Sequence, residues 1–564
     1  MKTISSIRLL TLLVFLAAAP QLRADSLDDL ARDFWAWRAA EQPLSTDDIP
    51  RIERPVAWQP DWSPVAVDRY RKQLEVFEGR WKKIDAWSWP VSRQVDYRLM
   101  GSAIARVRWE LELLRNWQRN PAFYVDQTAG AYFSLLLQPP PFNAARSQQI
   151  VATLNSIPRT VEDAEKNLTQ PAAPFARLAL EQLQSIRPAM LASIAELKPL
   201  LDTQAARSID GAAGLAIAAL ESYRDWIAQR VATMSAETAV GRDAYAFFLH
   251  KVALLPFTPE QVLTMGRQEW PRSVASQAYE EHRNLGSPQL PLFKDQSEQM
   301  AHEEKDELAV RRYLEEKDIL TVPNWVQHYR FAPMPAYLAP VAGFGEGDDF
   351  TSPSRLKDNC TRYINQPSPN LGYFALTTAK DPRPEIVHEG VPGHYFQLAV
   401  SWAHPDFIRR YYYDSGANEG LGFYAEEMMM HSGLFDDSPR SREIIWNFMR
   451  LRALRVEVDV KLALGEFSLD QAADYLKNAV PMDSATAHGE AALFSSTPGQ
   501  AISYQIGKLQ IYRFLADAHR TKGGAFSLRA FHDFLWLNGN VPIALQRWEY
   551  LGMKDEIDEL DRMN

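Results

Sequence analysis

The chain has 564 residues, of which 46% are hydrophobic and 23% are charged, and its formal net charge is −10. This composition predicts a folded protein with a large core, and it disfavours a nucleic-acid protein, because tracking phosphates requires clustered, uncompensated Lys and Arg. The single cysteine, Cys360, excludes an intramolecular disulfide, so stability must come from burial.

Residues 1–24 are typical of a secretory signal peptide. Lys2 and Arg8 give a basic start, residues 9–19 give a short apolar core, and Ala24 offers a small residue at the cleavage point. That core is about half the roughly 20 residues needed to cross a bilayer, and no other stretch of the sequence is long and apolar enough. We therefore expect a periplasmic or secreted product without a membrane span.

The mature chain, about 540 residues, exceeds the size at which one core stops growing, so we expect two lobes around a deep cleft. Residues 25–240 repeat apolar side chains at three- and four-residue steps, which predicts a helical N-terminal lobe. Residues 241–564 would form the second, catalytic lobe, which opens with another helical run over residues 242–317. The last apolar stripe of the first lobe comprises Ile209, Ala213, Ala216, Leu220, Tyr223, Ile227, Val231 and Met234.

Between residues 322 and 384 the composition changes, because Pro, Gly, Ser, Asn and Asp cluster there. Long irregular stretches in a globular chain are functional or disordered, and the aromatic content of this one favours an ordered, functional segment. Residues 372–376 (GYFAL) predict a short strand just before a histidine motif, where it would suit a substrate-binding edge. Helices resume after that motif, for example over residues 443–464.

The histidine motif occupies residues 388–394 (HEGVPGH). Catalytic zinc sites need three nitrogen or oxygen ligands, an open position for water and a carboxylate that takes the proton of that water. His388 and His394 supply two ligands, and Glu389 supplies the base. In the common arrangement such histidines are four residues apart, whereas His388 and His394 are six residues apart. On a regular helix a spacing of six residues would place the two side chains roughly 120° apart around the axis and about 9 Å apart along it. A proline and a glycine inside the motif permit a distortion, and a bulge of two residues from the helix would bring His388 and His394 near the register of a four-residue pair.

Glu419 is the third candidate ligand, because it opens a predicted helix over residues 419–427 at the downstream distance where metallopeptidases often place their final glutamate. Glu426 follows two turns later on nearly the same face and would either orient a ligand histidine or exchange roles with Glu419. The alternative interpretation is a proline-broken helix cap with satisfied histidines and two surface carboxylates. Zinc is the metal that base rates favour for this ligand set, and other divalent ions also fit it.

Four motifs stand in a fixed order: residues 388–397 (HEGVPGHYFQ), 419–426 (EGLGFYAE), 452–459 (RALRVEVD) and 498–507 (PGQAISYQIG). In that order and spacing they resemble the domain-of-unknown-function 885 family of bacterial predicted metallopeptidases. That group is itself distantly similar to the helical zinc carboxypeptidases of the Taq type. The resemblance covers most of the mature chain.

The resemblance implies a mainly α-helical, zincin-like fold with a deep central cleft and a few short strands near the active site. It supports His388, His394 and Glu419 as metal ligands and Glu389 as general base. It also points to Tyr504, whose hydroxyl would hydrogen-bond the oxyanion formed on a peptide carbonyl and contribute about 3 kcal/mol. A buried tyrosine with a purely structural hydroxyl is the alternative.

The chain also departs from the family at several positions. Tyr395 stands where members often carry a second histidine, and Leu421 stands where they carry a tryptophan. Residues 460–463 (VKLA) replace a Thr-Gly pair and a following histidine, and Leu493 replaces an arginine. The ligands themselves are retained, so the departures predict altered specificity or weakened activity.

The leading hypothesis is a zinc-dependent hydrolase that cleaves short peptides with a metal-activated water, with Glu389 as base and Tyr504 at the oxyanion. The departures motivate an alternative, a periplasmic peptide-binding or scaffold protein with a non-hydrolytic site. A serine hydrolase is disfavoured, because the sequence has no Gly-x-Ser-x-Gly elbow. Arg383 would suit the carboxylate of a carboxypeptidase substrate, whereas an aminopeptidase needs acidic groups for the amine, and the sequence leaves both polarities open.

Overall fold

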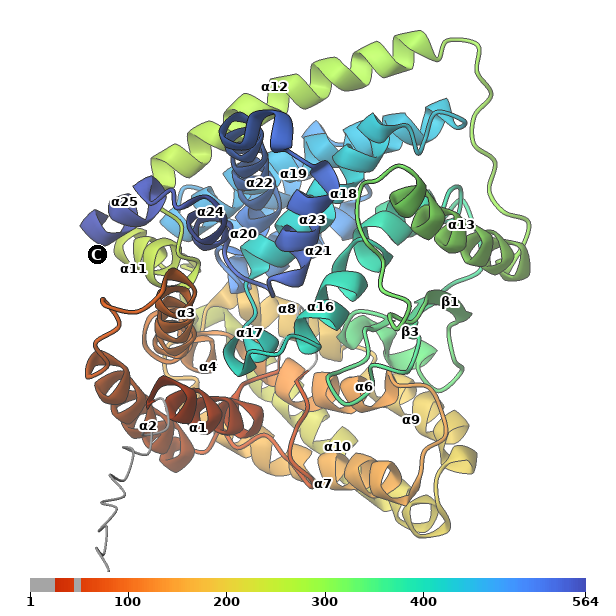
Figure 1. The fold of residues 1–564 in the computed structure, drawn as a ribbon. Helices are drawn as coiled ribbons and strands as arrows, with labels where there is room; N and C mark the ends of the chain where they lie inside the picture. The colour runs from red at the N-terminus through yellow and green to blue at the C-terminus, as the bar shows by residue number, and fades with distance from the viewer. Residues whose placement is uncertain (1–25, 45–51, 564) are drawn as a thin grey trace, which may run out of the picture.

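The computed structural model describes residues 26–44 and 52–563, so the predicted signal peptide lies outside the described residues (Figure 1). The described chain is mainly helical and carries one small sheet, which confirms the predicted fold class in its coarse form. No helix within these two ranges has the length and apolar character needed to span a membrane.

The predicted N-terminal helical run is confirmed. Its last stripe is buried from Ile209 to Ile227, while Val231 and Met234 lie beyond the end of the helix. The helices of this part are α1 (Ser26–Glu41), α2 (Pro64–Lys82), α3 (Val91–Arg108), η1 (Trp109–Leu114), α4 (Asn116–Arg119), α5 (Pro121–Val125), η2 (Asp126–Gly130), α6 (Ala131–Leu136), α7 (Ala144–Asn167), α8 (Ala173–Leu183), α9 (Ile186–Leu197), η3 (Lys198–Leu200), α10 (Thr203–Ala228) and η4 (Val231–Thr233).

The second helical run leads into the irregular segment, which holds a three-stranded sheet in the order β1-β3-β2. Strand β1 pairs with β3 in parallel, and β2 pairs with β3 antiparallel. These elements are α11 (Arg242–Phe247), η5 (Phe248–Val252), α12 (Pro259–Arg283), α13 (Gln296–Glu316), β1 (Tyr329–Pro333), η6 (Ala339–Phe344), β2 (Asp348–Asp349), β3 (Cys360–Ile364), α14 (Tyr373–Thr378) and α15 (Arg383–Glu385).

The predicted strand at residues 372–376 is wrong, because this stretch forms the start of helix α14. The carboxylate of Asp483 accepts the backbone N–H of Tyr373 at 3.1 Å, at the N-terminus of that helix. The ring centroids of Tyr373 and Phe374 both lie 5.8 Å from that of Phe448. Contacts with residues far away in the sequence therefore override the local β-preference of an aromatic run.

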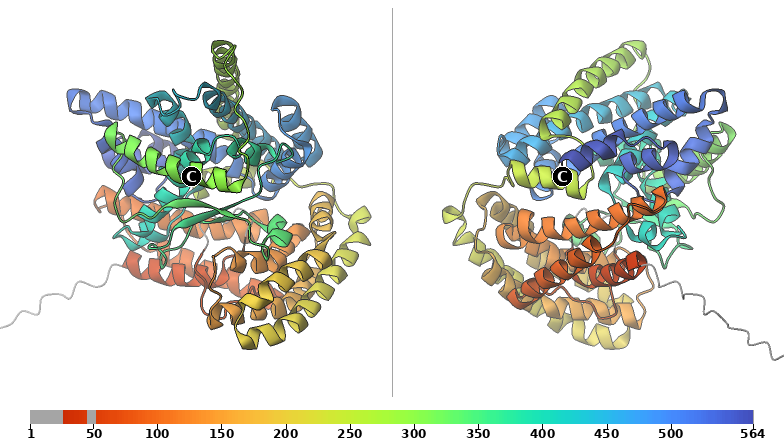
Figure 2. Two further views of the ribbon diagram at one scale, coloured as in Figure 1. Left: turned by 90° about the vertical axis from the view of Figure 1, so that its right-hand side faces the viewer. Right: turned by 60° about the vertical axis from the view of Figure 1, so that its left-hand side comes forward.

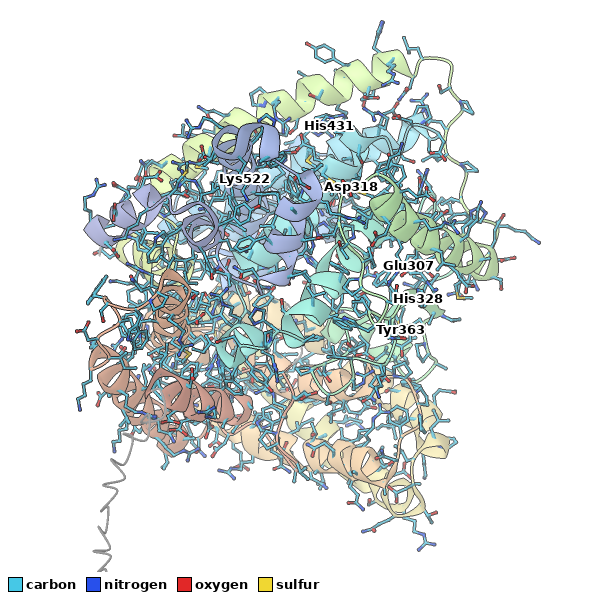
Figure 3. All side chains as sticks on the ribbon, in the orientation of Figure 1. Glu307, Asp318, His328, Tyr363, His431 and Lys522 are labelled. Atoms are coloured by element: carbon cyan, nitrogen blue, oxygen red, sulfur yellow. The ribbon has the colours of Figure 1, made fainter. Side chains whose placement is uncertain are left out.

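Buried acidic side chains of α13 form ion pairs and hydrogen bonds with β1 and the residue that precedes it. Glu307, which is fully buried, contacts Arg311 at 2.5 Å, His328 Nδ1 at 3.0 Å and Arg330 at 3.2 Å (Figure 3). Glu303, one turn earlier, accepts the backbone N–H of Phe331 in β1 at 3.1 Å. A buried acid stays charged only beside such donors, so these contacts fix the position of β1.

The helices that follow build the other half of the molecule, and the sheet lies between this half and the N-terminal helices (Figure 2). One hydrophobic core joins the N-terminal helices to apolar residues of α17 and α24. The elements are η7 (Ile386–Gly390), α16 (His394–Trp402), α17 (Phe407–Tyr411), α18 (Ser415–Ser432), α19 (Pro439–Leu464), α20 (Leu469–Ala479), α21 (Ser484–Ser496), α22 (Gln500–Lys522), η8 (Gly523–Ala525), α23 (Leu528–Leu537), α24 (Ile543–Leu551) and α25 (Asp555–Met563).

Helices α18 and α22 meet backbone to backbone through glycines. A Cβ built at Gly507 would lie 2.1 Å from the carbonyl oxygen of Gly416 and 2.8 Å from the Cα of Gly420. Since van der Waals contact between such atoms needs more than 3 Å, only glycine allows this approach. The crossing brings Glu419 of α18 and Tyr504 of α22 into one region of the fold.

Gly507→Ala is therefore expected to lower the free energy of unfolding by about 3 kcal/mol, because the added methyl group forces the two helices apart. Urea unfolding measures the change. Gly214→Ala is the matched control, since Gly214 is exposed on α10 with no atom near its Cβ position, and alanine there should stabilise by about 1 kcal/mol or less. Equal stability of the two variants would contradict the close crossing.

Candidate metal centre

The two histidines of the motif lie on separate helical segments. The turn η7 ends at Gly390, Val391 is extended, and helix α16 begins at His394. The two histidines are thus not joined by a two-residue bulge within one helix, because the helix ends and restarts instead. Pro392 cannot donate a helical hydrogen bond, and its carbonyl accepts the indole N–H of Trp536 at 2.6 Å, which holds the break in place.

Helix α18 supplies both predicted glutamates. Asp414 caps its first turn by accepting the backbone N–H of Ala417 at 2.7 Å. Glu419 Oε2 lies 3.1 Å from His394 Nε2 and 3.6 Å from His388 Nε2. Two turns later, Glu426 Oε1 lies 2.6 Å from His388 Nδ1. Glu419 and Glu426 therefore lie on one face of α18. Glu419 lies on the Nε2 side of the His388 ring, which faces His394, and Glu426 lies on the opposite, Nδ1 side.

His388, His394 and Glu419 fit the requirements of a metal centre. All three are buried, and each offers one ligand atom within 4.8 Å of the others. Ligand atoms bound to one tetrahedral zinc at about 2.1 Å stand about 3.4 Å apart, and the two distances above bracket that value. Within the described ranges, the buried Glu419 Oε2 has no aligned hydrogen bond, which is the arrangement expected of lone pairs directed at a common point.

The electrostatics of the cluster favour a cation. Burial alone would raise the pKa of the Glu419 carboxyl, but His394 and His388 hold it well below its ordinary value. Burial alone would lower the pKa of His388, but Glu419 and Glu426 outweigh it and raise that pKa to about 10. Both shifts mean that the carboxylates stabilise positive charge at this point. With Glu426 beside Nδ1, His388 would carry its proton there and leave Nε2 free for a metal.

The side chain of Glu389 is more exposed than those of the two histidines of the motif. About a fifth of its side chain is exposed (21%), and its Oε2 lies 3.9 Å from His394 Nε2. Burial raises the pKa of its carboxyl. Behind it, Arg362 of β3 pairs with Asp348 of β2 and lies 3.1 Å from Glu385. The sheet thus supports the segment that carries the predicted base.

Tyr504 lies at the same centre. Its ring is parallel to that of His388, with centroids 6.3 Å apart and 10° between the planes. The guanidinium carbon of Arg455 lies 4.7 Å from the Tyr504 ring, and Arg455 itself forms a buried pair with Glu490 (Nε to Oε2, 2.6 Å). The structure therefore brings all six predicted site residues together, including Glu426.

Sequence reasoning assigned no role to Arg452, which lies beside this cluster. Its side chain is buried, and its Nη2 lies 3.5 Å from Glu426 Oε1. In the described part of the chain its Nε and Nη1 have no hydrogen-bond partner, while the rings of Phe423 and Phe448 face the guanidinium. The signal in the sequence was the spacing of Arg452, Arg455 and Asp459 on one side of α19.

Asp459 positions the helix that carries Tyr504. Its carboxylate accepts the backbone N–H groups of Gly499 at 2.9 Å and Ala501 at 2.8 Å, and the hydroxyl of Tyr245 at 2.9 Å. An acceptor at this point satisfies the unpaired donors of the first turn of α22. Burial raises the pKa of Asp459 to about 7.

Two solved structures share this fold. A candidate lipoprotein from Colwellia psychrerythraea matches with a TM-score of 0.73 and 17% identity over 95% of this chain and 100% of that one. A candidate lipoprotein of unknown function from Shewanella oneidensis matches with a TM-score of 0.68 and 17% identity over 93% and 97%. At this identity the likeness concerns the fold alone.

No curated protein matches the chain. The family model described as bacterial protein of unknown function (DUF885) matches residues 57–548, which is most of the sequence. The chain therefore belongs to the DUF885 family of bacterial proteins.

Proposed function

We propose that the protein is a zinc-dependent hydrolase that cleaves short peptides. The observation that carries the proposal is the buried convergence of His388, His394 and Glu419, with the more accessible Glu389 beside it. Two histidines and one carboxylate form a frequent ligand set of catalytic zinc, and a neighbouring glutamate is the usual base. We also propose that the centre lies in a two-lobed, zincin-like fold.

Bound zinc would polarise the peptide carbonyl and lower the pKa of the attacking water to about 7. The Glu389 carboxylate would accept the proton of that water and deliver it to the nitrogen of the departing amine. The Tyr504 hydroxyl would donate a hydrogen bond to the oxyanion on the carbonyl oxygen. Glu426, with Arg452 behind it, would keep His388 in its ligand orientation.

We further propose that the protein works outside the cytoplasm. Residues 1–24 have the pattern of a signal peptide, and the two proteins with the same fold are described as candidate lipoproteins. A cell fractionation that follows the full chain tests this location.

A peptide-digestion assay tests the hydrolase proposal. The zinc-loaded chain is incubated with a defined mixture of short peptides, and the products are identified by mass spectrometry. We expect cleavage that stops when a chelator removes the metal and returns when zinc is restored. Stoichiometric peptide binding without any product would contradict hydrolysis and would favour a peptide-binding protein instead.

A further inference from the structure

A cavity of about 510 Å³ lies between the N-terminal helices and the beginnings of α18 and α22. Helices α1 and α3 contribute to its wall, and each contacts α17, which also contributes to it (Figure 1). Aromatic side chains make up much of that wall, among them Trp35, Trp62, Trp109, Trp117, Phe123 and Trp402. Such a wall suits the apolar side chains of a ligand, and aromatic faces also attract cations.

The cavity ends close to the candidate metal centre. Ser415 and Gln500 line it at the first turns of α18 and α22, and the Ser415 hydroxyl donates to Gln500 Oε1 at 2.8 Å. Glu419 and Tyr504 follow four residues later on the same helix faces, which is about 6 Å along each axis. The end of the cavity at Ser415 and Gln500 therefore lies about one helical turn from Glu419 and Tyr504.

Asp126, the first residue of η2, is a partly buried acid in the cavity wall. Within residues 26–44 and 52–563 its carboxylate has neither a hydrogen bond nor an ion pair. Burial raises its pKa to about 8, and no cation among the described residues opposes that effect. A carboxyl in such surroundings gains most from a ligand that brings a positive charge and hydrogen-bond donors.

Two other charged groups of the wall have partners within the protein. Arg38 pairs with Glu110 at 2.9 Å, and Glu53 accepts a backbone N–H at 2.9 Å. Burial raises the pKa of Asp414 to about 6, and Arg106, which acts on Asp414 beside Ser415, does not act on Asp126. Asp126 is therefore an acid of the wall with no cation beside it among the described residues.

The group predicted to bind a substrate carboxylate is also occupied. Arg383 contacts Asp381 at 2.9 Å and Asp437 at 2.8 Å. It is thus held by two acids of the protein, which removes the main sequence argument for a carboxypeptidase.

We propose that the cavity binds the amine-bearing end of a short peptide, with an ammonium group beside Asp126 and the adjoining side chain against the aromatic wall. The choice of a peptide rests on the proposed function. The ammonium group is the free α-amine of the peptide, so the residues before the cleaved bond lie in the cavity. A lysine side chain is the other possible source of an ammonium group.

Calorimetric titration at pH 7 tests this proposal in the Glu389→Gln chain, in which turnover is expected to be at least about a hundredfold slower. The probes are the tetrapeptide Phe-Ala-Ala-Ala, its N-acetylated form, and N-acetylated Lys-Ala-Ala-Ala. The α-amine is largely charged at this pH. Each probe is titrated into Glu389→Gln alone, into that chain with Asp126→Asn, and into that chain with Asp243→Asn. Asp243 is exposed on α11, outside the cavity, so Asp243→Asn controls for effects of an aspartate-to-asparagine change that do not depend on the cavity.

We expect the free tetrapeptide to bind about tenfold more tightly than either acetylated probe, and we expect Asp126→Asn, but not Asp243→Asn, to remove that preference. Tight binding of the acetylated lysine probe alone would assign the cavity to side-chain amines and overturn the α-amine assignment. Equal binding of all probes, no binding, or a preference that survives Asp126→Asn would overturn the proposal. The titration measures binding and the digestion assay measures hydrolysis. A failure to find hydrolysis would therefore not change the binding result, and a failure to find binding at Asp126 would not change the hydrolysis result.

Discussion

Glu389→Gln is expected to lower kcat by about 10²- to 10⁴-fold while the metal stays bound, because glutamine keeps the shape of the side chain but cannot accept a proton. The metal should remain, since Glu389 lies outside the group formed by His388, His394 and Glu419. Steady-state kinetics on the best peptide and metal content of the same sample measure both effects.

Glu389→Asp serves as the control for this change. It retains a carboxylate on a shorter side chain, so it should keep more activity than Glu389→Gln. Full turnover in a Glu389→Gln chain that still holds its metal would show that Glu389 is not the base.

The second large effect is expected for Gly393→Ala. A Cβ at this position would lie 1.8 Å from the carbonyl oxygen of His388 and 2.6 Å from that of Val387. Both neighbours are backbone atoms, so the chain between the two histidines must shift by more than an ångström. We expect a loss of about 3 kcal/mol or more in the free energy of unfolding, together with weakened metal binding, because the shift separates His388 from His394.

Urea unfolding and metal titration of purified Gly393→Ala measure these losses. Gly343→Ala provides the control, since no atom lies near its Cβ position in η6 and its stability should change little. A Gly393→Ala chain with the stability and metal affinity of the parent would contradict the geometry of the break in the motif.

Local patterns predicted the parts of the fold in which one face of a long helix is buried. The apolar stripe of α10 from Ile209 to Ile227 is an example, because its period matches the helix and its polar residues face solvent. The same reasoning failed at Tyr373, where a short aromatic run is helical because it packs on Phe448 and is capped by Asp483. Short segments take their structure from tertiary contacts that a local pattern does not contain.

The sequence predicted those residues of the candidate site that zinc coordination restricts to a few residue types. His388, His394 and Glu419 followed from zinc coordination, and the structure gathers them. The helix break between the histidines was only partly predicted, because the backbone path depends on packing against Trp536, far along the chain. The sequence did not predict the roles now proposed for Arg452 and Asp126. A buried arginine, or an acid with no partner among the described residues, is recognisable only from its three-dimensional surroundings.

The most direct test of the metal centre is the zinc content of the untagged chain, measured by elemental mass spectrometry after zinc loading and exhaustive dialysis. The arrangement of His388, His394 and Glu419 predicts about one zinc per chain, and almost none in His394→Ala or Glu419→Ala. A parent chain without zinc, or variants that retain as much zinc as the parent, would contradict the proposed centre and with it the hydrolase.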